Sequence, residues 1–145
     1  MKYGPFDKYD LEKSHMFGAN LTKVLNNDTG VINVWCNGGE KRDLLYVNDF
    51  CEFVYKAINK QKNNYSLFNV GYGQALSVKE IISMIIKLSN KNIALKFDTS
   101  MPSIKTSLSL NCSKANKELS WYPKTKLSDG IKKSILWYKD NILND

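Results

Sequence analysis

Apolar residues along the chain recur with two spacings, a helical spacing of three to four residues and the shorter spacing of strands. The clearest helix follows Ser77, where the form S-x-x-E predicts a capping box. Further helices are predicted from His15 to Asn26, after Asn48, from Ser113 to Leu119 and from Ser128 onward. We expect the helix after Asn48 to carry its apolar face on Phe50, Phe53, Val54, Ala57 and Ile58.

Short β-rich runs lie between the predicted helices. These runs are Val31–Trp35, Asp43–Val47, Leu67–Val70 and Ile93–Phe97. Polar and glycine-rich turns separate them at residues 26–30, 37–40 and 71–73. Helices and strands alternate without a repeat or a low-complexity linker, so the pattern predicts a single α/β domain over residues 1–145.

The composition narrows the class of protein. The 145 residues carry a net charge of +7, and Arg42 is the only arginine. A basic chain raises the possibility of nucleic-acid binding, but the lysines are spread along the sequence without an arginine–aromatic patch, which argues against it. No apolar run is long enough to predict a membrane span. Three scattered cysteines and one histidine form no zinc pattern and suit a reducing cytoplasm.

The first fifteen residues contain the only histidine. Gly4-Pro5 predicts an irregular backbone, and Ser14 is a candidate N-cap for the helix that follows. An imidazole held where a loop becomes a helix can exchange a proton near neutral pH. Position alone leaves the alternative open that His15 is an ordinary solvated or packed histidine.

Several segments together resemble the extended short-chain dehydrogenase/reductase family, and in particular its bifunctional GDP-sugar epimerase-reductases. The segments are YGPFDKYDLEKSH, VWCNGGEKRDLLYVND, LFNVGYG, the S-x-x-E helix, FDTS and ELSWYPKTKLSDGI. YGP alone is common among nucleotide-sugar enzymes, whereas YGP followed by Ser-His is more specific. The resemblance covers nearly the whole chain and implies the α/β substrate-binding domain of that family.

The glycine-rich phosphate loop of the family's dinucleotide-binding half is not found in the sequence. The pair Tyr9 and Lys13 has the spacing of the family's Tyr-x-x-x-Lys dyad, but it lies in the wrong place and is interpreted as a coincidence. We therefore expect a carboxy-terminal half with the Rossmann half absent. The resemblance implies that NADP binds only together with that half and that the isolated chain is inactive. It also implies a Rossmann-domain chain as a candidate partner, and a homo-oligomer.

The resemblance also assigns roles near the amino terminus. His15 matches the catalytic acid that protonates the sugar carbon during epimerisation. Lys2 matches the last residues of the cofactor loop, so Lys2 and His15 are expected beside the cofactor. Lys23 falls where the family places a substrate-binding arginine, and lysine keeps that charge without the guanidinium fork.

The central segment carries the predicted nucleotide-sugar contacts. Trp35 matches a tryptophan that packs on the nucleotide-sugar, and Arg42 matches the arginine that binds the diphosphate. Cys36 and Asp49 are interpreted as structural. After FDTS the family usually continues K-P-D-G-x-x-R-K, but here only Lys105 supplies a charge, which weakens the prediction of GDP specificity.

Two other hypotheses for the function of the chain stay open at this point. The chain can belong to another NDP-sugar epimerase or dehydratase, of the UDP-glucose 4-epimerase type, which needs no acid at position 15. It can also be a non-catalytic module that binds a nucleotide-sugar or a partner chain.

Overall fold

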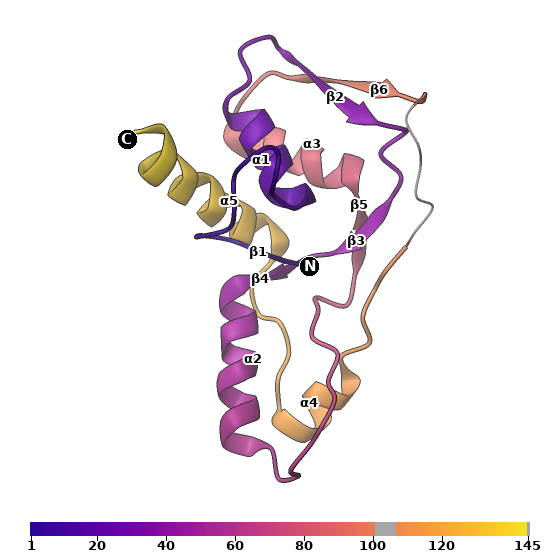
Figure 1. The fold of residues 1–145 in the computed structure, drawn as a ribbon, viewed down its shortest axis with the longest axis vertical. Helices are drawn as coiled ribbons and strands as arrows, with labels where there is room; N and C mark the ends of the chain where they lie inside the picture. Colours follow the sequence, from indigo (N-terminus) through magenta and orange to yellow (C-terminus); the bar gives the residue numbers. More distant parts are fainter. Residues whose placement is uncertain (101–106, 145) are drawn as a thin grey trace.

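The computed structural model describes residues 1–100 and 107–144, and it has an α/β architecture (Figure 1). The helices are α1 (Met16–Leu25), α2 (Val47–Lys60), α3 (Val78–Ser89), α4 (Ser113–Leu119) and α5 (Leu127–Tyr138), which continues as a π-helical turn over Lys139–Leu143. The strands are β1 (Lys2–Tyr3), β2 (Val31–Trp35), β3 (Lys41–Asp43), β4 (Leu45–Tyr46), β5 (Ala75–Ser77) and β6 (Ala94–Asp98).

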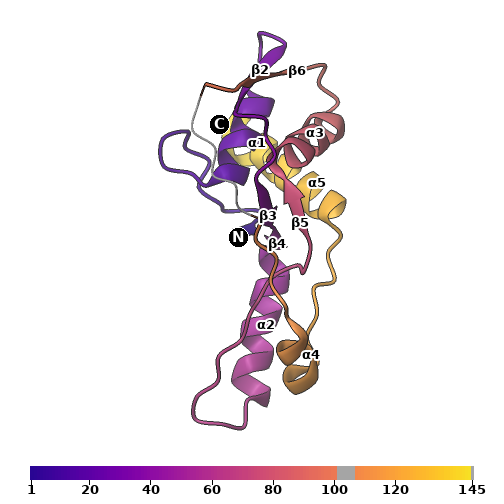
Figure 2. The ribbon, with the colours of Figure 1, turned by 90° about the vertical axis from the view of Figure 1, so that its right-hand side faces the viewer.

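The described strands form three separate two-stranded sheets. β1 pairs with β4 and β2 with β6, both in parallel, whereas β3 and β5 are antiparallel. In the β2–β6 ladder Trp35 lies opposite Asp98, and in the β3–β5 ladder Arg42 lies opposite Leu76. These two ladders place the predicted substrate segment along one side of the elongated molecule (Figures 1 and 2).

The main core lies where α1, α3 and α5 pack together, as both ribbon views show (Figures 1 and 2). Phe17 and Leu21 of α1, Ile81 of α3 and Ile131 of α5 are fully buried there. The ring of Tyr3 packs against Phe17 with centroids 4.5 Å apart, which joins β1 to this core. The core therefore fixes both the start of α1 and the strand that precedes it.

A second cluster joins α2 to α4 at the other end of the molecule. It contains Leu45, Ala115, Leu119 and Trp121, with Phe53 packed edge-on against the Trp121 ring at 5.4 Å. The Trp121 indole nitrogen donates to a backbone carbonyl of α2 at 3.0 Å. A buried Trp usually needs such a partner, and this bond ties the segment after α4 to the start of α2.

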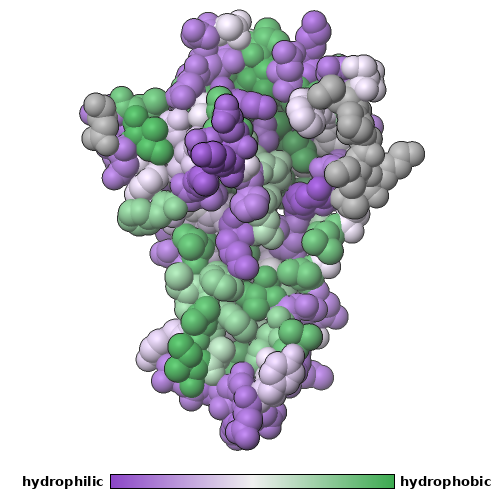
Figure 3. Space-filling model, viewed as in Figure 1, coloured by the Kyte–Doolittle hydropathy of each residue, from purple (hydrophilic) through white to green (hydrophobic). Residues whose placement is uncertain are grey.

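The apolar face of α2 was predicted only in part. Phe50, Phe53 and Ala57 pack on the second cluster as expected. Val54 and Ile58 do not, because they are 39% and 77% exposed. Figure 3 shows hydrophobic side chains at the surface over the region of α2. The helix is apolar on two faces, and one of them is uncovered by the described chain.

Several of the predicted helices and strands are present in the structure. The predicted helix from His15 to Asn26, the strands near 31–35 and 93–97, and the helix over Ser113–Leu119 are confirmed. The capping box is confirmed as well, with the Ser77 hydroxyl accepting from the Glu80 amide at 3.2 Å and the Glu80 carboxylate accepting from the Ser77 amide at 2.8 Å.

Other predictions were wrong at the ends of elements. The run Asp43–Val47 is split between β3 and β4, and α2 already begins at Val47, so Asn48 is not its cap. Ser14 does not cap α1, because His15 holds the N-cap position without a side-chain bond. Residues 67–70 form no strand; Leu67 is 71% exposed and the backbone runs past α4 without ladder partners.

Candidate functional site

The loop before His15 is pinned to α1 by buried hydrogen bonds. The Tyr9 hydroxyl donates to the Gly4 carbonyl at 2.7 Å, and the Thr22 hydroxyl donates to the Tyr9 carbonyl at 2.9 Å. Gly18 is needed here, since a Cβ at this position would lie 2.7 Å from the carbonyl oxygen of Lys8. The loop and the helix are thereby held as one unit, and His15 takes a defined place at their junction.

His15 is exposed at the start of α1, with its backbone in an extended conformation. Its imidazole caps no helical amide, so the ring is available to a ligand at this end of the helix. Lys23 is also exposed, in the last turn of α1. Eight residues of helix separate them by about 12 Å along the axis. One small group cannot contact both side chains, whereas an extended ligand can.

The pair Tyr9 and Lys13 has no dyad chemistry in this structure. Burial raises the pKa of the Tyr9 hydroxyl, with a further contribution from the Asp7 carboxylate. A tyrosine that transfers a proton needs the opposite shift. Tyr9 instead packs against the Trp137 ring, with centroids 5.7 Å apart, and has a structural role.

Trp35 ends β2 with its side chain 64% exposed. The chain turns sharply just after it, because Cys36 has a positive φ of 55° and its amide donates to the Asp98 carbonyl at 2.7 Å. An exposed indole at the end of a ladder forms a flat apolar surface beside open solvent. This position suits stacking on a ligand better than it suits core packing.

The turn between Trp35 and Arg42 rests on the first turn of α3. The Val78 amide donates to the Glu40 carbonyl at 2.9 Å, and the Lys79 amide donates to the Gly38 carbonyl at 3.0 Å. Gly38 has a φ of +65°, and a Cβ there would lie 3.3 Å from the Lys79 amide nitrogen. The first amides of α3, which have no partner within the helix, are thus bonded to carbonyls of the turn. These bonds fix the turn in place.

Arg42 lies on β3 and is half-buried. One guanidinium nitrogen forms an ion pair with Glu40 at 2.9 Å, and the other donates to the Lys41 carbonyl at 3.1 Å. The guanidinium fork presents several donors in one plane, a geometry that matches phosphate oxygens. Glu40 is the acidic group that this arginine holds in the structure.

Lys105 lies outside the described residues, but both ends of its segment are described. The segment leaves β6 after Asp98, which pairs with Trp35, and returns at Ser107, which forms a bridge with Lys41. The described residues at its two ends are thus paired with Trp35 and with β3.

Lys2 is exposed on β1, with its ammonium group 4.4 Å from the centre of the Phe50 ring. It lines a hollow of about 170 Å³ together with the Gly4-Pro5 loop and Val47. Cofactor pockets enclose roughly 300–1,000 Å³, so this hollow is too small to enclose a dinucleotide. Lys2 and the nearby loop could contact only one edge of such a group.

Sequence reasoning missed the role of Asp43, which is 2% exposed at the end of β3. Its carboxylate accepts from the amides of Tyr72 at 2.6 Å, Gly73 at 3.0 Å and Leu110 at 3.0 Å. The sequence does contain a signal for this role, since Asp43 stands directly before the apolar pair Leu44-Leu45. A carboxylate in a buried run must be paired, because unpaired carboxylates are rarely buried. Asp43 organises the loops around β3.

Asp49 was expected to be structural, and its contacts support that role. Its buried carboxylate accepts from the backbone amides of Lys124 at 3.2 Å and Thr125 at 3.0 Å. These bonds hold the segment after α4 on the first turn of α2. The acidic group also lies at the positive end of the helix dipole.

Comparison with known proteins now adds to this geometry. The model of the NAD dependent epimerase/dehydratase family matches residues 1–71. A GDP-L-colitose synthase from Yersinia pseudotuberculosis is 28% identical over 99% of this chain and 47% of that protein. A GDP-L-fucose synthase from Sinorhizobium fredii is 30% identical over 99% of this chain and 46% of that protein.

A solved UDP-glucuronic acid 4-epimerase from Bacillus cereus, in complex with NAD, superposes with a TM-score of 0.82 at 25% identity, over the whole of this chain and 42% of that one. The chain resembles the NAD dependent epimerase/dehydratase family over residues 1–71 and these enzymes along nearly its whole length. It spans about half the length of the curated relatives that it matches, and so represents part of their fold.

Members of this family use a nicotinamide cofactor, as the NAD in the Bacillus cereus epimerase illustrates. Over residues 1–100 and 107–144, no group of three or more histidine, cysteine or acidic side chains is placed to hold a metal ion. None of the described helices combines the length and the apolar character needed to cross a membrane.

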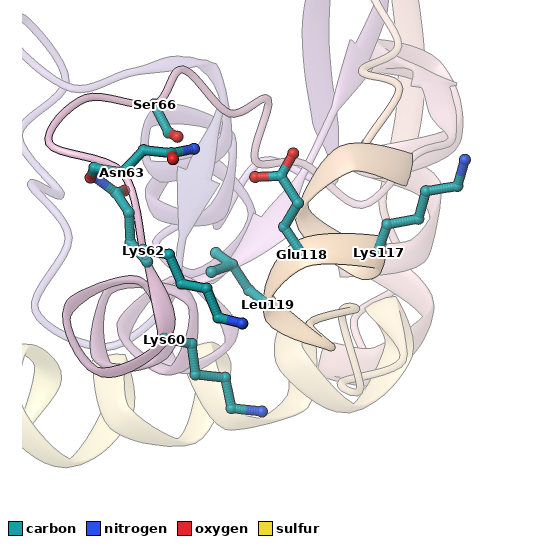
Figure 4. Close-up of a pocket in the computed structure, with 8 residues that line it drawn as sticks. Lys60, Lys62, Asn63, Ser66, Lys117, Glu118 and Leu119 are labelled. Atoms are coloured by element: carbon teal, nitrogen blue, oxygen red, sulfur yellow. The ribbon is translucent and has the colours of Figure 1, made fainter.

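A larger hollow of about 360 Å³ lies elsewhere, where the carboxy-terminal ends of α2 and α4 meet (Figure 4). Lys60 and Lys62 line one side and Lys117 and Glu118 the other. Lysines near helix carboxy-termini are favoured by the helix dipole, which accounts for their presence. Among the described residues, none that was predicted for the extended short-chain dehydrogenase/reductase site lines this hollow.

Proposed function

We propose that the chain is the nucleotide-sugar-binding half of an NADP-dependent GDP-4-keto-6-deoxymannose epimerase-reductase. The observation that carries this proposal is the match of almost the whole chain to enzymes named GDP-L-fucose synthase and GDP-L-colitose synthase. The exposed His15 at the start of α1, and the exposed Trp35 and half-buried Arg42 on either side of one turn, agree with it.

Each proposed role follows from the chemistry of the side chain. His15 delivers a proton to the sugar carbon, for which its exposed position at the helix start is suitable. Arg42 binds the diphosphate and Trp35 packs on the nucleotide-sugar. Lys23 and Lys105 add positive charge toward the same anionic ligand.

The cofactor site is completed by a further unit. We propose that a Rossmann-type segment or chain binds NADP, with Lys2 and His15 at its edge, and that the 145 residues alone are inactive. The uncovered apolar face of α2, with Tyr55 69% and Ile58 77% exposed, supports association, either with that unit or as a homo-oligomer. None of the three cysteines forms a disulfide, which favours a cytoplasmic location, and neither nucleic acid nor membrane is proposed as a partner.

A second candidate is an NDP-sugar 4-epimerase, because the fold also matches the UDP-glucuronic acid 4-epimerase of Bacillus cereus at 25% identity. A simple 4-epimerisation does not use an acid at position 15. In the assembled enzyme, His15→Ala should abolish 3,5-epimerisation under the first proposal. Full activity of that variant on a UDP-sugar would favour the second.

Calorimetric titration of the chain with GDP-mannose, UDP-glucose and NADPH tests the proposal. We expect GDP-mannose to bind, Arg42→Ala to weaken that binding at least tenfold, and NADPH not to bind. Tighter binding of UDP-glucose than of GDP-mannose would reject the GDP-sugar assignment. NADPH oxidation by the pure chain would reject the proposed dependence on a second unit.

A further inference from the structure

The guanidinium of Arg42 is already engaged by an anionic group of the chain itself. Glu40 directly precedes β3, and its carboxylate lies 2.9 Å from a guanidinium nitrogen of Arg42, each side chain retaining 27% exposure. Residues two apart in an extended segment project to the same side, so the backbone itself directs the two groups together. The ion pair is a local property of the turn before β3.

The backbone of Glu40 is also fixed from the other side. Its carbonyl accepts from the Val78 amide at the start of α3 at 2.9 Å. The side chain, in contrast, contacts one guanidinium nitrogen and stays 27% exposed. A rigid backbone that carries a half-exposed carboxylate can present that carboxylate to Arg42 and still release it without unfolding the turn.

Carboxylate and phosphate oxygens bind a guanidinium through the same charge-assisted hydrogen bonds. We infer that Glu40 is a specificity-determining residue that occupies the diphosphate position on Arg42 and must be displaced by an incoming diphosphate. This inference rests on the proposed role of Arg42 in nucleotide-sugar binding. A weakly bound monoanion would not displace Glu40, whereas a diphosphate with more charge and more oxygens would.

The size of the effect follows from the exposure of the pair. Half-exposed ion pairs contribute modestly because water and salt screen them. Removing the competing charge of Glu40 should therefore tighten diphosphate binding about two- to fivefold at low salt. The gain should shrink as the salt concentration rises, since added ions screen the pair in the free protein.

Inorganic pyrophosphate is the probe, followed by NMR through the Nε–H signal of Arg42 in the 145-residue chain. We expect Glu40→Gln to lower the dissociation constant two- to fivefold. Glu12→Gln removes the same charge from an exposed loop residue and should change the constant much less. In an Arg42→Met background, Glu40→Gln should give no gain.

Two results would overturn the inference. One is a dissociation constant of Glu40→Gln that equals that of the wild type or of Glu12→Gln. The other is an Arg42 signal that pyrophosphate does not move even in Glu40→Gln. Failure of the proposed function looks different: GDP-mannose would then fail to bind, while the pyrophosphate gain on removing Glu40 would still be measured.

Discussion

Replacing Asp43 by asparagine tests the anchor that holds the loops around β3. One carboxylate oxygen accepts from the Tyr72 amide, and the other accepts from the amides of Gly73 and Leu110. Asparagine has nearly the same shape but only one acceptor oxygen. Its best orientation keeps the Gly73 and Leu110 bonds and turns an NH₂ group toward the Tyr72 amide.

The expected loss follows from these three bonds. The lost bond to a charged acceptor was worth roughly 1.5–3 kcal/mol, and each kept bond weakens by about 1 kcal/mol on becoming neutral. The neutral amide is less costly to bury than a carboxylate, which offsets part of the loss. We expect Asp43→Asn to lower the free energy of unfolding by about 2–4 kcal/mol, a large share of a typical domain's stability.

Urea unfolding followed by tryptophan fluorescence measures this change, with the slope of the transition checked against the wild type. Asp10→Asn is the control, because Asp10 also accepts two backbone amides, at 2.8 and 3.0 Å, but in an exposed loop. It should change stability by less than about 0.5 kcal/mol. Equal effects of the two substitutions would refute the reasoning, as would unchanged hydrogen exchange at Tyr72 and Leu110.

Three further substitutions or modifications have defined outcomes. Ser77→Ala should cost about 1 kcal/mol in thermal or urea unfolding. The capping bonds lower the pKa of Glu80, so their stabilisation is present above the unfolded pKa and is lost as the pH falls through the folded pKa. The deficit of Ser77→Ala should therefore shrink in acid, below the unfolded pKa. Trp121→Phe keeps the ring packing but loses the buried indole donor, and calorimetry should show a loss of about 1–3 kcal/mol. Burial raises the pKa of Cys112, so mass spectrometry after alkylation near pH 8 should find the exposed Cys51 labelled first.

Prediction from the sequence was most accurate for elements whose ends are determined by a local residue pattern. Ser77 and Glu80 are three residues apart and satisfy each other, so the start of α3 follows from local chemistry alone. The ends of β3 and β4 were missed because short strands are defined by partners far along the chain. β5 shows the same limit, since its pairing with β3 depends on the fold rather than on its own residues.

The candidate site divides in a similar way. Trp35 and Arg42 were predicted from the resemblance as ligand contacts, and that role stays a prediction; the structure places an exposed Trp35 and a half-buried Arg42 on either side of the same turn. The engagement of Arg42 by Glu40 and the three amides on Asp43 were missed, although both acidic residues lie close to Arg42 in the sequence, because these contacts also depend on side-chain geometry in the folded chain. A catalytic role for His15 stays a prediction.

The adjacent residues Arg42 and Asp43 explain why the turn before β3 can be rigid and yet bind a ligand. Neighbouring side chains of a strand point to opposite faces, so Asp43 is buried toward the loops while Arg42 faces partly to solvent. Asp43 holds Leu110, and the chain between Ser107 and Leu110 then runs beside β3. A substitution at Asp43 should therefore weaken diphosphate binding at Arg42 without touching the ligand, whereas a substitution at Glu40 should strengthen it. Opposite effects of substituting Glu40 and Asp43 would distinguish the acidic residue that competes with the diphosphate from the one that anchors the loops.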